Sequence, residues 1–328
     1  MGLKIAGPIG TNVSIIGGTI NQNLTITSSS GILTVHVPMD NHLFEDEVVV
    51  DTGIRISADN DIRVIATNES VSPGANTSES WAVWATDKLD MEYIIVDASS
   101  SISAGTSHSI AIVGTQPKTD VIIRDKAGVE ISVTLNAGQA YRYATIGRTV
   151  TATKPIAVIA GVECTSDVGA YCDMTAAQMA PIRYWGHDFV VAPGFASNST
   201  TSKANHVVIA LKDNTSVTIK DSNGVTRTYT LNARQHEMFE TGTTAQLGYL
   251  VTADKPIAVF SNLGDPAPRY PAHAVGEKGS AAPTLVSWPP IDGYVESAKM
   301  ATSGLDDSKY ENFLTIITHA PRRLHKSA

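Results

Sequence analysis

An internal repeat constrains the fold of this 328-residue chain more than any other feature of its sequence. Residues 120–139 align without a gap on residues 216–235, a shift of 216 − 120 = 96, and ten of the twenty positions are identical. The stretch "VTATKPIAVIAGVEC" at 150–164 returns as "VTADKPIAVFSNLGD" at 251–265, and a weaker copy lies within residues 24–66. Self-similarity over such distances is the signature of a repeat architecture, so we expect three copies of one unit.

Apolar and polar residues alternate within each copy, which predicts β-strands. In "VTIKDSNGVTRTYTL", at 217–231, two alternating runs flank Asn223-Gly224, a dipeptide that favours a tight hairpin turn. Lys-Pro pairs at 154–155 and 255–256 come just before apolar runs, so we expect each proline at the first residue of a strand. Ser, Thr, Val, Ile and Gly dominate the composition, which favours strands over helices. The sequence therefore predicts an all-β fold.

Two all-β architectures fit a repeat of this length. Two four-stranded blades per repeat would give a six-bladed β-propeller-like ring, which we favour, whereas one sandwich per repeat would give tandem β-sandwich modules. Blade packing predicts that Leu135 and Leu231, one repeat apart, occupy equivalent buried positions. A strand at residues 313–318 would close the ring against the first repeat. The expected units are residues 1–80 (a divergent first repeat), 81–184 and 185–285, with 286–328 as a partial fourth repeat or ring-closing segment.

Charge and composition exclude several classes of function. The formal net charge of −8 at pH 7 disfavours nucleic-acid binding, and no apolar run reaches the ~20 residues of a membrane span. The first residues lack the pattern of a secretory signal, so we expect either a cytoplasmic protein or a mature or trimmed one. The common nucleophile, zinc-protease, P-loop and dinucleotide motifs do not occur, so we expect no enzyme, no cofactor and no metal site.

Histidines, acidic residues and tryptophans have structural interpretations in this pattern. His108 and His206 both precede a strand, at what reads as the same repeat position, which favours a structural or surface role over catalysis. The acidic stretch 59–61 lacks the twelve-residue calcium-loop pattern, so a solvated turn is the simpler interpretation. The tryptophans fall where repeats join, which favours packing between repeats over a platform for sugar stacking. They are Trp81, Trp84, Trp185 and Trp288.

Several ordered motifs carry a family resemblance over nearly the whole chain. They are K-P-I-A-V with a cysteine pair behind it, Q-M-A-P-I-x-x-W-G-x-D-F-V-V-A-P (178–193), D-N-T-S-V-T-I (213–219) and L-N-A-x-Q. In this order they resemble the N-terminal domain of the IgG Fc-binding protein family. The resemblance implies an extracellular or cell-surface, non-catalytic binding or structural module. It does not imply antibody binding, and the chain departs from larger members in lacking adjoining Cys-rich domains.

Cys164 and Cys172 are the only cysteines, and seven residues separate them. A disulfide would close this loop and stabilise the fold by up to ~2–3 kcal/mol. Two reduced, buried thiols are the alternative, and a metal site is disfavoured because the spacing is too long. The family resemblance also places a cysteine pair in this loop. A disulfide would imply an oxidising compartment.

Asparagine sequons have two interpretations. They mark sites for N-glycosylation in a eukaryotic secretory pathway, or they reflect a Ser/Thr-rich β-protein whose turns use asparagine. The sequons start at Asn12, Asn23, Asn68, Asn76, Asn198 and Asn214.

Unequal insertions interrupt the repeats after the same strand, at residues 69–80, 165–175 and 264–283. Variable loops at one place in each repeat are expected to gather on one face and to bind, although a disordered connector is the alternative. We therefore expect an extracellular adhesion or matrix-binding module that recognises protein or glycan through these loops. The alternatives are a self-assembling subunit of a surface layer or filament, which pairs through an open strand edge, and a hydrolase on a propeller scaffold. The candidate contact residues are Tyr171, Asp173, Arg269, Tyr270 and His273.

Overall fold

The computed structural model confirms the predicted all-β class. It describes residues 2–38, 46–72, 75–95, 108–125, 128–144, 149–165, 173–191, 205–240, 248–263, 284–288 and 290–291. These residues form 22 strands and two three-residue 3₁₀ helices, η2 (Thr86–Lys88) and η3 (Ile182–Tyr184). No helix in these ranges is long and apolar enough to cross a membrane.

The first repeat forms two small antiparallel sheets, ordered β3-β2-β6 and β4-β1-β7-β8. A two-residue strand, β5, leaves this repeat to pair with the second one. The strands are β1 (Gly2–Ala6), β2 (Asn12–Gly17), β3 (Ile20–Thr25), β4 (Ile32–His36), β5 (Val49–Val50), β6 (Arg55–Ala58), β7 (Arg63–Ser72) and β8 (Ala75–Val83).

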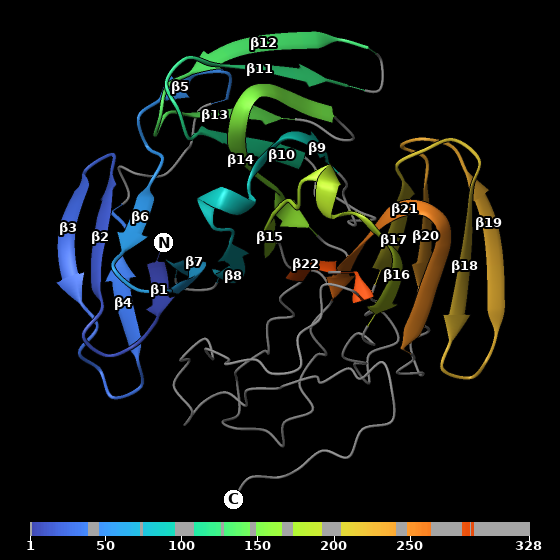
Figure 1. Cartoon of the computed structure of the whole chain (residues 1–328), viewed down its shortest axis with the longest axis horizontal. Coiled ribbons are helices and arrows are strands. Elements are labelled where there is room, and N and C mark those ends of the chain that lie inside the picture. The colour runs from blue at the N-terminus through green and yellow to red at the C-terminus, as the bar shows by residue number, and fades with distance from the viewer. Residues whose placement is uncertain are drawn as a thin grey trace, which may run out of the picture.

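The second and third repeats share one order of strands (Figure 1). The second comprises β9 (Asp90–Ile94), β10 (His108–Gly114), β11 (Thr119–Arg124), β12 (Glu130–Leu135), β13 (Ala140–Ala144), β14 (Thr149–Thr165) and β15 (Asp173–Gln178). The third comprises β16 (Gly186–Val191), β17 (Asn205–Ala210), β18 (Thr215–Asp221), β19 (Thr226–Leu231), β20 (His236–Glu240), β21 (Tyr249–Leu263) and β22 (Thr284–Trp288).

One long strand organises each of these two repeats. The first half of β14 pairs with β11 and β9, and its second half pairs with β10 and β15. Strand β21 does the same with β18 and β16 and then with β17 and β22. In the first repeat β6 and β7 take the places of the two halves as separate strands. We call the sheets of the first halves (β3-β2-β6, β12-β11-β14-β9, β19-β18-β21-β16) the hairpin sheets and the others the central sheets.

The Lys-Pro pairs mark the bend between the two halves. Pro155 lies between Ala152, the last residue of β14 paired with β11, and Ile156, the first paired with β10. Its missing N–H therefore removes no ladder bond, although the proline lies inside a continuous strand and not at the start of one. Lys154 Nζ donates to the carbonyl of Pro117, and Lys255 Nζ makes the equivalent contact with the Asp213 carbonyl (2.7 Å).

Turn geometry repeats along with the pairing. A residue with left-handed backbone precedes the first hairpin strand of each repeat. It is Gly10 (φ 91°) two positions before β2, Lys118 (φ 54°) just before β11 and Asn214 (φ 52°) just before β18. Only one of the three is glycine, so the surrounding turn imposes this conformation on ordinary side chains.

A hydrophobic core lies between the two sheets of each repeat. In the second repeat it takes Ile110 and Ile112 from the central sheet and Val121, Ile123 and Leu135 from the hairpin sheet. As predicted, Leu135 and Leu231 occupy equivalent buried places, because each closes its hairpin opposite Thr119 or Thr215. Burying one such side chain contributes about 1.5–3 kcal/mol.

The pairing does not divide into separate four-stranded blades, because the two sheets of a repeat share one strand. The favoured propeller ring is therefore not confirmed, and the arrangement within a repeat has the two-layer character of the alternative, tandem sandwiches. The strand predicted at residues 313–318 would distinguish a closed ring from tandem sandwiches, but it lies outside the described residues. The expected unit boundaries stay a prediction.

Candidate functional site

Two of the three predicted insertions, 165–175 and 264–283, lie between the strands of equivalent hairpins, β14–β15 and β21–β22. The prediction of a variable loop at 69–80 is wrong, because its described residues belong to β7 and β8 of the equivalent hairpin, which pair as far as Ser72 and Ala75. The second strands of these hairpins lie together in the middle of the molecule, with β15 beside both β8 and β22 (Figure 1). The three hairpins thus form one central cluster around which the repeats are arranged.

The first two hairpins of this central cluster point the same way. Ala176 N donates to Glu79 Oε2 (3.4 Å), and further along Trp84 N donates to Gln178 Oε1 (2.9 Å). Strands β8 and β15 run in the same direction past these contacts, so the hairpin ends at Ser72–Ala75 and Thr165–Asp173 lie on the same side of them.

The contact between β8 and β15 is polar and buried. The side chains of Glu79, Thr175 and Gln178 are 4%, 3% and 6% exposed. The Glu79 carboxylate accepts a hydrogen bond from Ser80 N (2.7 Å) in addition to that from Ala176. Because an unpaired buried carboxylate is costly, these hydrogen bonds fix the relative register of the two repeats and give the central cluster a rigid base.

The candidate contact residues fall near the turns or beyond the described part. Asp173 opens β15 opposite Thr165, the last residue of β14, so it lies at the turn end of its hairpin. Cys164 lies next to that end, while Cys172 is outside the described residues, so the disulfide stays a prediction. Tyr171, Arg269, Tyr270 and His273 also lie outside the described residues.

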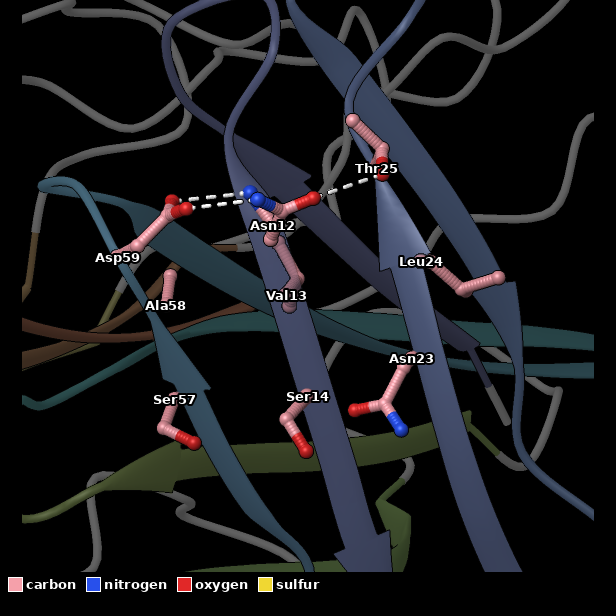
Figure 2. A pocket seen from close by; sticks show the side chains of 9 residues that line it. All are labelled: Asn12, Val13, Ser14, Asn23, Leu24, Thr25, Ser57, Ala58 and Asp59. Carbon is pink, nitrogen blue, oxygen red and sulfur yellow. Dashed lines mark hydrogen bonds between the residues drawn. The ribbon is translucent and has the colours of Figure 1, made fainter.

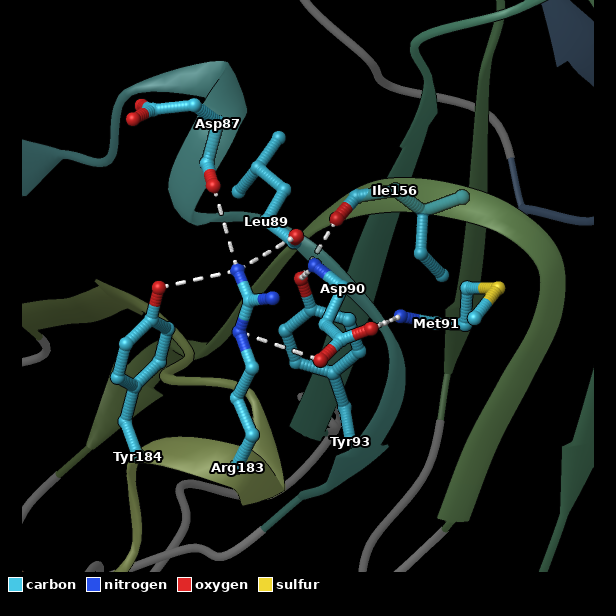
Figure 3. A network of polar contacts seen from close by, with 8 residues as sticks. All are labelled: Asp87, Leu89, Asp90, Met91, Tyr93, Ile156, Arg183 and Tyr184. Carbon is cyan, nitrogen blue, oxygen red and sulfur yellow. Dashed lines mark hydrogen bonds and ion pairs between the residues drawn. The ribbon is translucent and has the colours of Figure 1, made fainter.

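A polar network locks the connection between the second and third repeats (Figure 3). From η3, Arg183 Nη2 donates to the Leu89 carbonyl (3.1 Å), and Arg183 Nε pairs with Asp90 Oδ2 (3.2 Å). Tyr93 Oη donates to the Ile156 carbonyl (2.7 Å) and accepts from Asp90 N (3.1 Å). Burial raises the pKa of Tyr93 to about 12, so this hydroxyl keeps its proton. The network is structural, since its donors end on backbone carbonyls, the Asp90 carboxylate and the hydroxyls of Tyr93 and Tyr184.

Two of the four tryptophans have the packing role that we favoured. The ring of Trp84 packs against Tyr184, with centroids 5.2 Å apart. Trp185 is 8% exposed and belongs to the core of the second repeat, although it follows η3 at the start of the third. These rings join neighbouring repeats.

A shallow hollow of about 360 Å³ lies on the hairpin sheet of the first repeat (Figure 2). One hydrogen-bonded row crosses its three strands. Asn12 N and Nδ2 donate to the two carboxylate oxygens of Asp59 (2.9 and 2.8 Å), and Thr25 Oγ1 donates to Asn12 Oδ1 (2.9 Å). The hydrogen bonds from Asn12 lower the pKa of Asp59, so this exposed carboxylate stays ionised. The next row consists of Ser57, Ser14 and Asn23.

Sequence reasoning did not predict this hollow, because it interpreted Asn12 and Asn23 as sequons and Asp59 as part of a solvated turn. The available signal was a period of two on three strands, in Asn12-x-Ser14, Asn23-x-Thr25 and Ser57-x-Asp59. Related rows occur in the other repeats. Thr134 Oγ1 donates to Asp120 Oδ1 (2.6 Å) and Asp120 N to Thr153 Oγ1 (3.0 Å), and Ser216 N donates to Asp254 Oδ1 (2.7 Å). The first row is therefore a recurrent structural cap on the start of a strand.

The predicted equivalence of His108 and His206 is wrong. Strand register aligns Val113–Ala140 with Ile209–His236, a shift of 96, so His206 corresponds to Ile110. His206 is fully buried, and its Nδ1 lies 2.5 Å from Ser261 Oγ. Desolvation lowers its pKa to about 4, so the ring is neutral. In the part of the chain that the structure describes, no three His, Cys, Asp or Glu side chains gather as a metal site would require.

Comparison with known proteins confirms the family resemblance. The family model described as IgGFc binding protein matches residues 79–325. No curated protein sequence matches the chain. A solved structure, described as a tetra-tandem repeat in the extending region of a large adhesion protein, aligns at 14% identity over 86% of this chain and 67% of that chain. Its TM-score of 0.12 is too low to support an inference.

Proposed function

Because the chain belongs to the IgGFc binding protein family, we propose that it is an extracellular, non-catalytic module for adhesion or matrix binding. It recognises a protein or glycan through the turns of the central cluster. The observation that supports this proposal is the convergence of β8, β15 and β22, since the connections that precede these three strands are those in which the repeats differ in length.

The base of the central cluster is suited to presenting such turns. The buried Glu79–Ala176 and Trp84–Gln178 hydrogen bonds fix two of the hairpins, and the Arg183 network holds the connection to the third repeat. A rigid scaffold with variable connections is the usual arrangement for binding, since it keeps the entropy lost on association small.

The composition of the two longer connections supports contact with a macromolecule. They contain Tyr171, Arg269 and Tyr270, and tyrosine and arginine are enriched among the residues that dominate binding energy at interfaces. His273 and Asp173 add polar groups that would set specificity. A non-catalytic role is supported by the family and by the structural use of the polar side chains in the Arg183 network.

Binding of the whole chain to two probes tests this function: an immobilised immunoglobulin G Fc fragment and an array of extracellular-matrix and mucin-type glycans. We expect saturable binding to at least one of them. Replacing residues 166–171 or 264–283 by Gly-Ser segments of equal length should abolish it. Arg269→Ala and Tyr270→Ala should each weaken it at least tenfold, or about 1.4 kcal/mol.

The matched control replaces residues 222–224, the turn of the outer β18–β19 hairpin, with an equally long Gly-rich turn. This variant should bind as the parent does, because its turn lies on a hairpin sheet away from the central cluster. Binding that survives both replacements in the central cluster, or no binding to either probe, would contradict the proposed function.

A further inference from the structure

Three side chains with free hydrogen-bonding groups form one row across the hairpin sheet of the first repeat. Ser14 on β2 lies between Asn23 on β3 and Ser57 on β6, and all three line the shallow hollow (Figure 2). Asn23 and Ser57 are exposed and Ser14 is half-buried. Among the residues that the structure describes, none forms a hydrogen bond with these three side chains. Their two hydroxyls and one amide are therefore available to a ligand.

The neighbouring row holds a charged acceptor in a fixed position beside these groups. Asp59 Oδ1 accepts from Asn12 N (2.9 Å) and Asn60 Nδ2 (3.1 Å), and Asp59 Oδ2 accepts from Asn12 Nδ2 (2.8 Å). Each carboxylate oxygen has two lone pairs, so one lone pair of Oδ2 remains for a ligand. Because Asp59 also lines the hollow, the site combines one fixed acceptor with three groups that both donate and accept.

The hollow depends on a small side chain in the middle of the sheet. Strand pairing places Ile122 in the second repeat and Thr218 in the third where the first has Ser14, since the residue before each pairs with an alanine of the next strand. Both are branched at Cβ and larger than serine, so they occupy the space that Ser14 leaves open. The bonded row at Asn12 recurs in the other repeats, whereas the free row does not, so the shared fold does not require the hollow.

The groups in the hollow favour a neutral ligand that is rich in hydroxyls. The ionised Asp59 repels an anion. A peptide strand would need free backbone groups, but β2 is paired along both edges, by β3 and β6. A sugar ring carries several hydroxyls, each of which donates and accepts, and these match two serine hydroxyls, one amide and one carboxylate lone pair.

An exposed aliphatic side chain borders the hollow along β2. Ile16 lies two residues beyond Ser14 on the same face of the sheet and is 52% exposed. Residues two apart in a strand are separated by ~6.8 Å, which is the scale of one sugar ring. Sugar rings have an apolar C–H face, and covering Ile16 with such a face removes apolar surface from water. The sheet thus offers hydrogen bonds to one ring and an apolar contact to the next.

We propose that the hollow of the first repeat binds one unit of a neutral oligosaccharide. Hydroxyls of this unit bond with Ser14, Asn23 and Ser57, and one hydroxyl donates to Asp59 Oδ2. The next unit lies on Ile16. Because the hollow is shallow and lies along the face of a sheet, it accepts a unit within a sugar chain. The site lies on the outer sheet of the first repeat, away from the central cluster, and it does not depend on binding by the turns there (Figure 1).

Isothermal titration calorimetry of the whole chain tests this proposal with four probes: chitohexaose, cellohexaose, mannohexaose and poly-N-acetyllactosamine. We expect saturable binding to at least one of them, in the millimolar range because the hollow is shallow. Ser14→Ile should weaken binding at least tenfold by filling the hollow, and it should fold because the second repeat has isoleucine at this place. The matched control is Thr218→Ile on the third repeat, which should bind as the parent does.

Two smaller changes make the test independent of how the new isoleucine packs. Asn23→Ala and Ser57→Ala each remove one free group from an exposed position, and each should weaken binding several-fold. No binding to any probe, or equal affinity in the parent and in all three variants, would overturn the proposal. The replacements at 166–171 and 264–283 should leave oligosaccharide binding unchanged. If they abolish it while Ser14→Ile does not, the central cluster binds the sugar and the hollow does not.

Asn23 provides one more test, because it begins a sequon. A glycan attached to this side chain would occupy the hollow, so the proposal requires that Asn23 is unmodified. Mass spectrometry of the native protein should therefore find a free side chain at this position. An attached glycan at Asn23 would contradict the site, and so would a protein probe whose binding Ser14→Ile abolishes while no oligosaccharide binds.

Discussion

The second and third repeats build the same two sheets around β14 and β21, yet one buried cross-strand pair is apolar in the second and polar in the third. Ile110 faces Ala160 in the second repeat, whereas His206 faces Ser261 in the third. The polar pair is buried, and His206 also packs against Phe239 and Tyr249 at ring distances of 5.2 and 5.5 Å. The third repeat holds a histidine in place of an isoleucine because Ser261 satisfies Nδ1 and aromatic rings pack against the imidazole, although Nε2 is buried without a hydrogen-bond partner.

Two repeats with the same topology can therefore differ in how their stability depends on pH. An apolar pair stabilises the core at any pH, whereas a buried histidine does so only while it is neutral. The two repeats also differ in the turn of the central hairpin, where only the second has cysteines. Three experiments separate what the two repeats share from what distinguishes them.

The largest effect is expected where the repeats are most alike. Leu135→Ala and Leu231→Ala each remove a buried side chain from an equivalent place, so each should lower the free energy of unfolding by about 2–5 kcal/mol. Urea denaturation gives the size, and hydrogen exchange shows whether each loss is confined to its own repeat. Losses that differ by more than ~2 kcal/mol would mean that the two cores are not equivalent.

Acid should distinguish the repeats next. His206 has a pKa of about 4 in the folded chain and about 6.5 when unfolded, so between these values the unfolded chain binds more protons. The stabilisation that depends on a neutral His206 should therefore be fully present above pH 6.5. It should fall as pH drops toward 4, by up to about 3 kcal/mol.

The double change His206→Ile with Ser261→Ala gives the third repeat the apolar pair of the second. We expect it to remove this acid sensitivity, as measured by denaturation between pH 7 and pH 4. The matched control is Ile110→Val in the equivalent apolar pair of the second repeat, which adds and removes no titratable group and should therefore leave the shape of the pH profile unchanged. A double variant that loses stability in acid as steeply as the parent would show that other groups dominate.

Sequence analysis predicted local features well and long-range pairing poorly. The hairpins around Gly128 and Gly224 and the burial of Leu135 and Leu231 follow from period-two patterns and turn residues, which are local. The sequence did not predict that β14 continues through Pro155, because a proline in a β-pattern usually indicates the first residue of a strand. The pairing of β14 with β11 before the proline and with β10 after it is needed to see that the strand is continuous. Only the geometry of these two ladders shows that the missing N–H of the proline falls between them.

The site divides along the same line. The interruptions after the same strand of each repeat predicted that these segments lie close together, and the contact between β8 and β15 brings two of the three hairpins together. The buried Glu79 and Gln178 beneath it carry no sequence signal, since their role depends on contact between strands almost 100 residues apart. The error over His206 has a related cause. Counting residues before a strand misplaced it by two positions, and only pairing with β20 corrects the count.

The smallest effect tests the cysteines, which distinguish the second central hairpin from the third. A Cys164–Cys172 disulfide closes a short loop, so its reduction should lower the stability of the β14–β15 hairpin by ~2 kcal/mol. Hydrogen exchange of β15 should then speed up, while that of β22 stays constant because its hairpin contains no cysteine. Alkylation of the native chain without reductant should label neither thiol. Two labelled thiols in native protein would rule out the disulfide, and they would also remove the oxidising compartment from the case for an extracellular module.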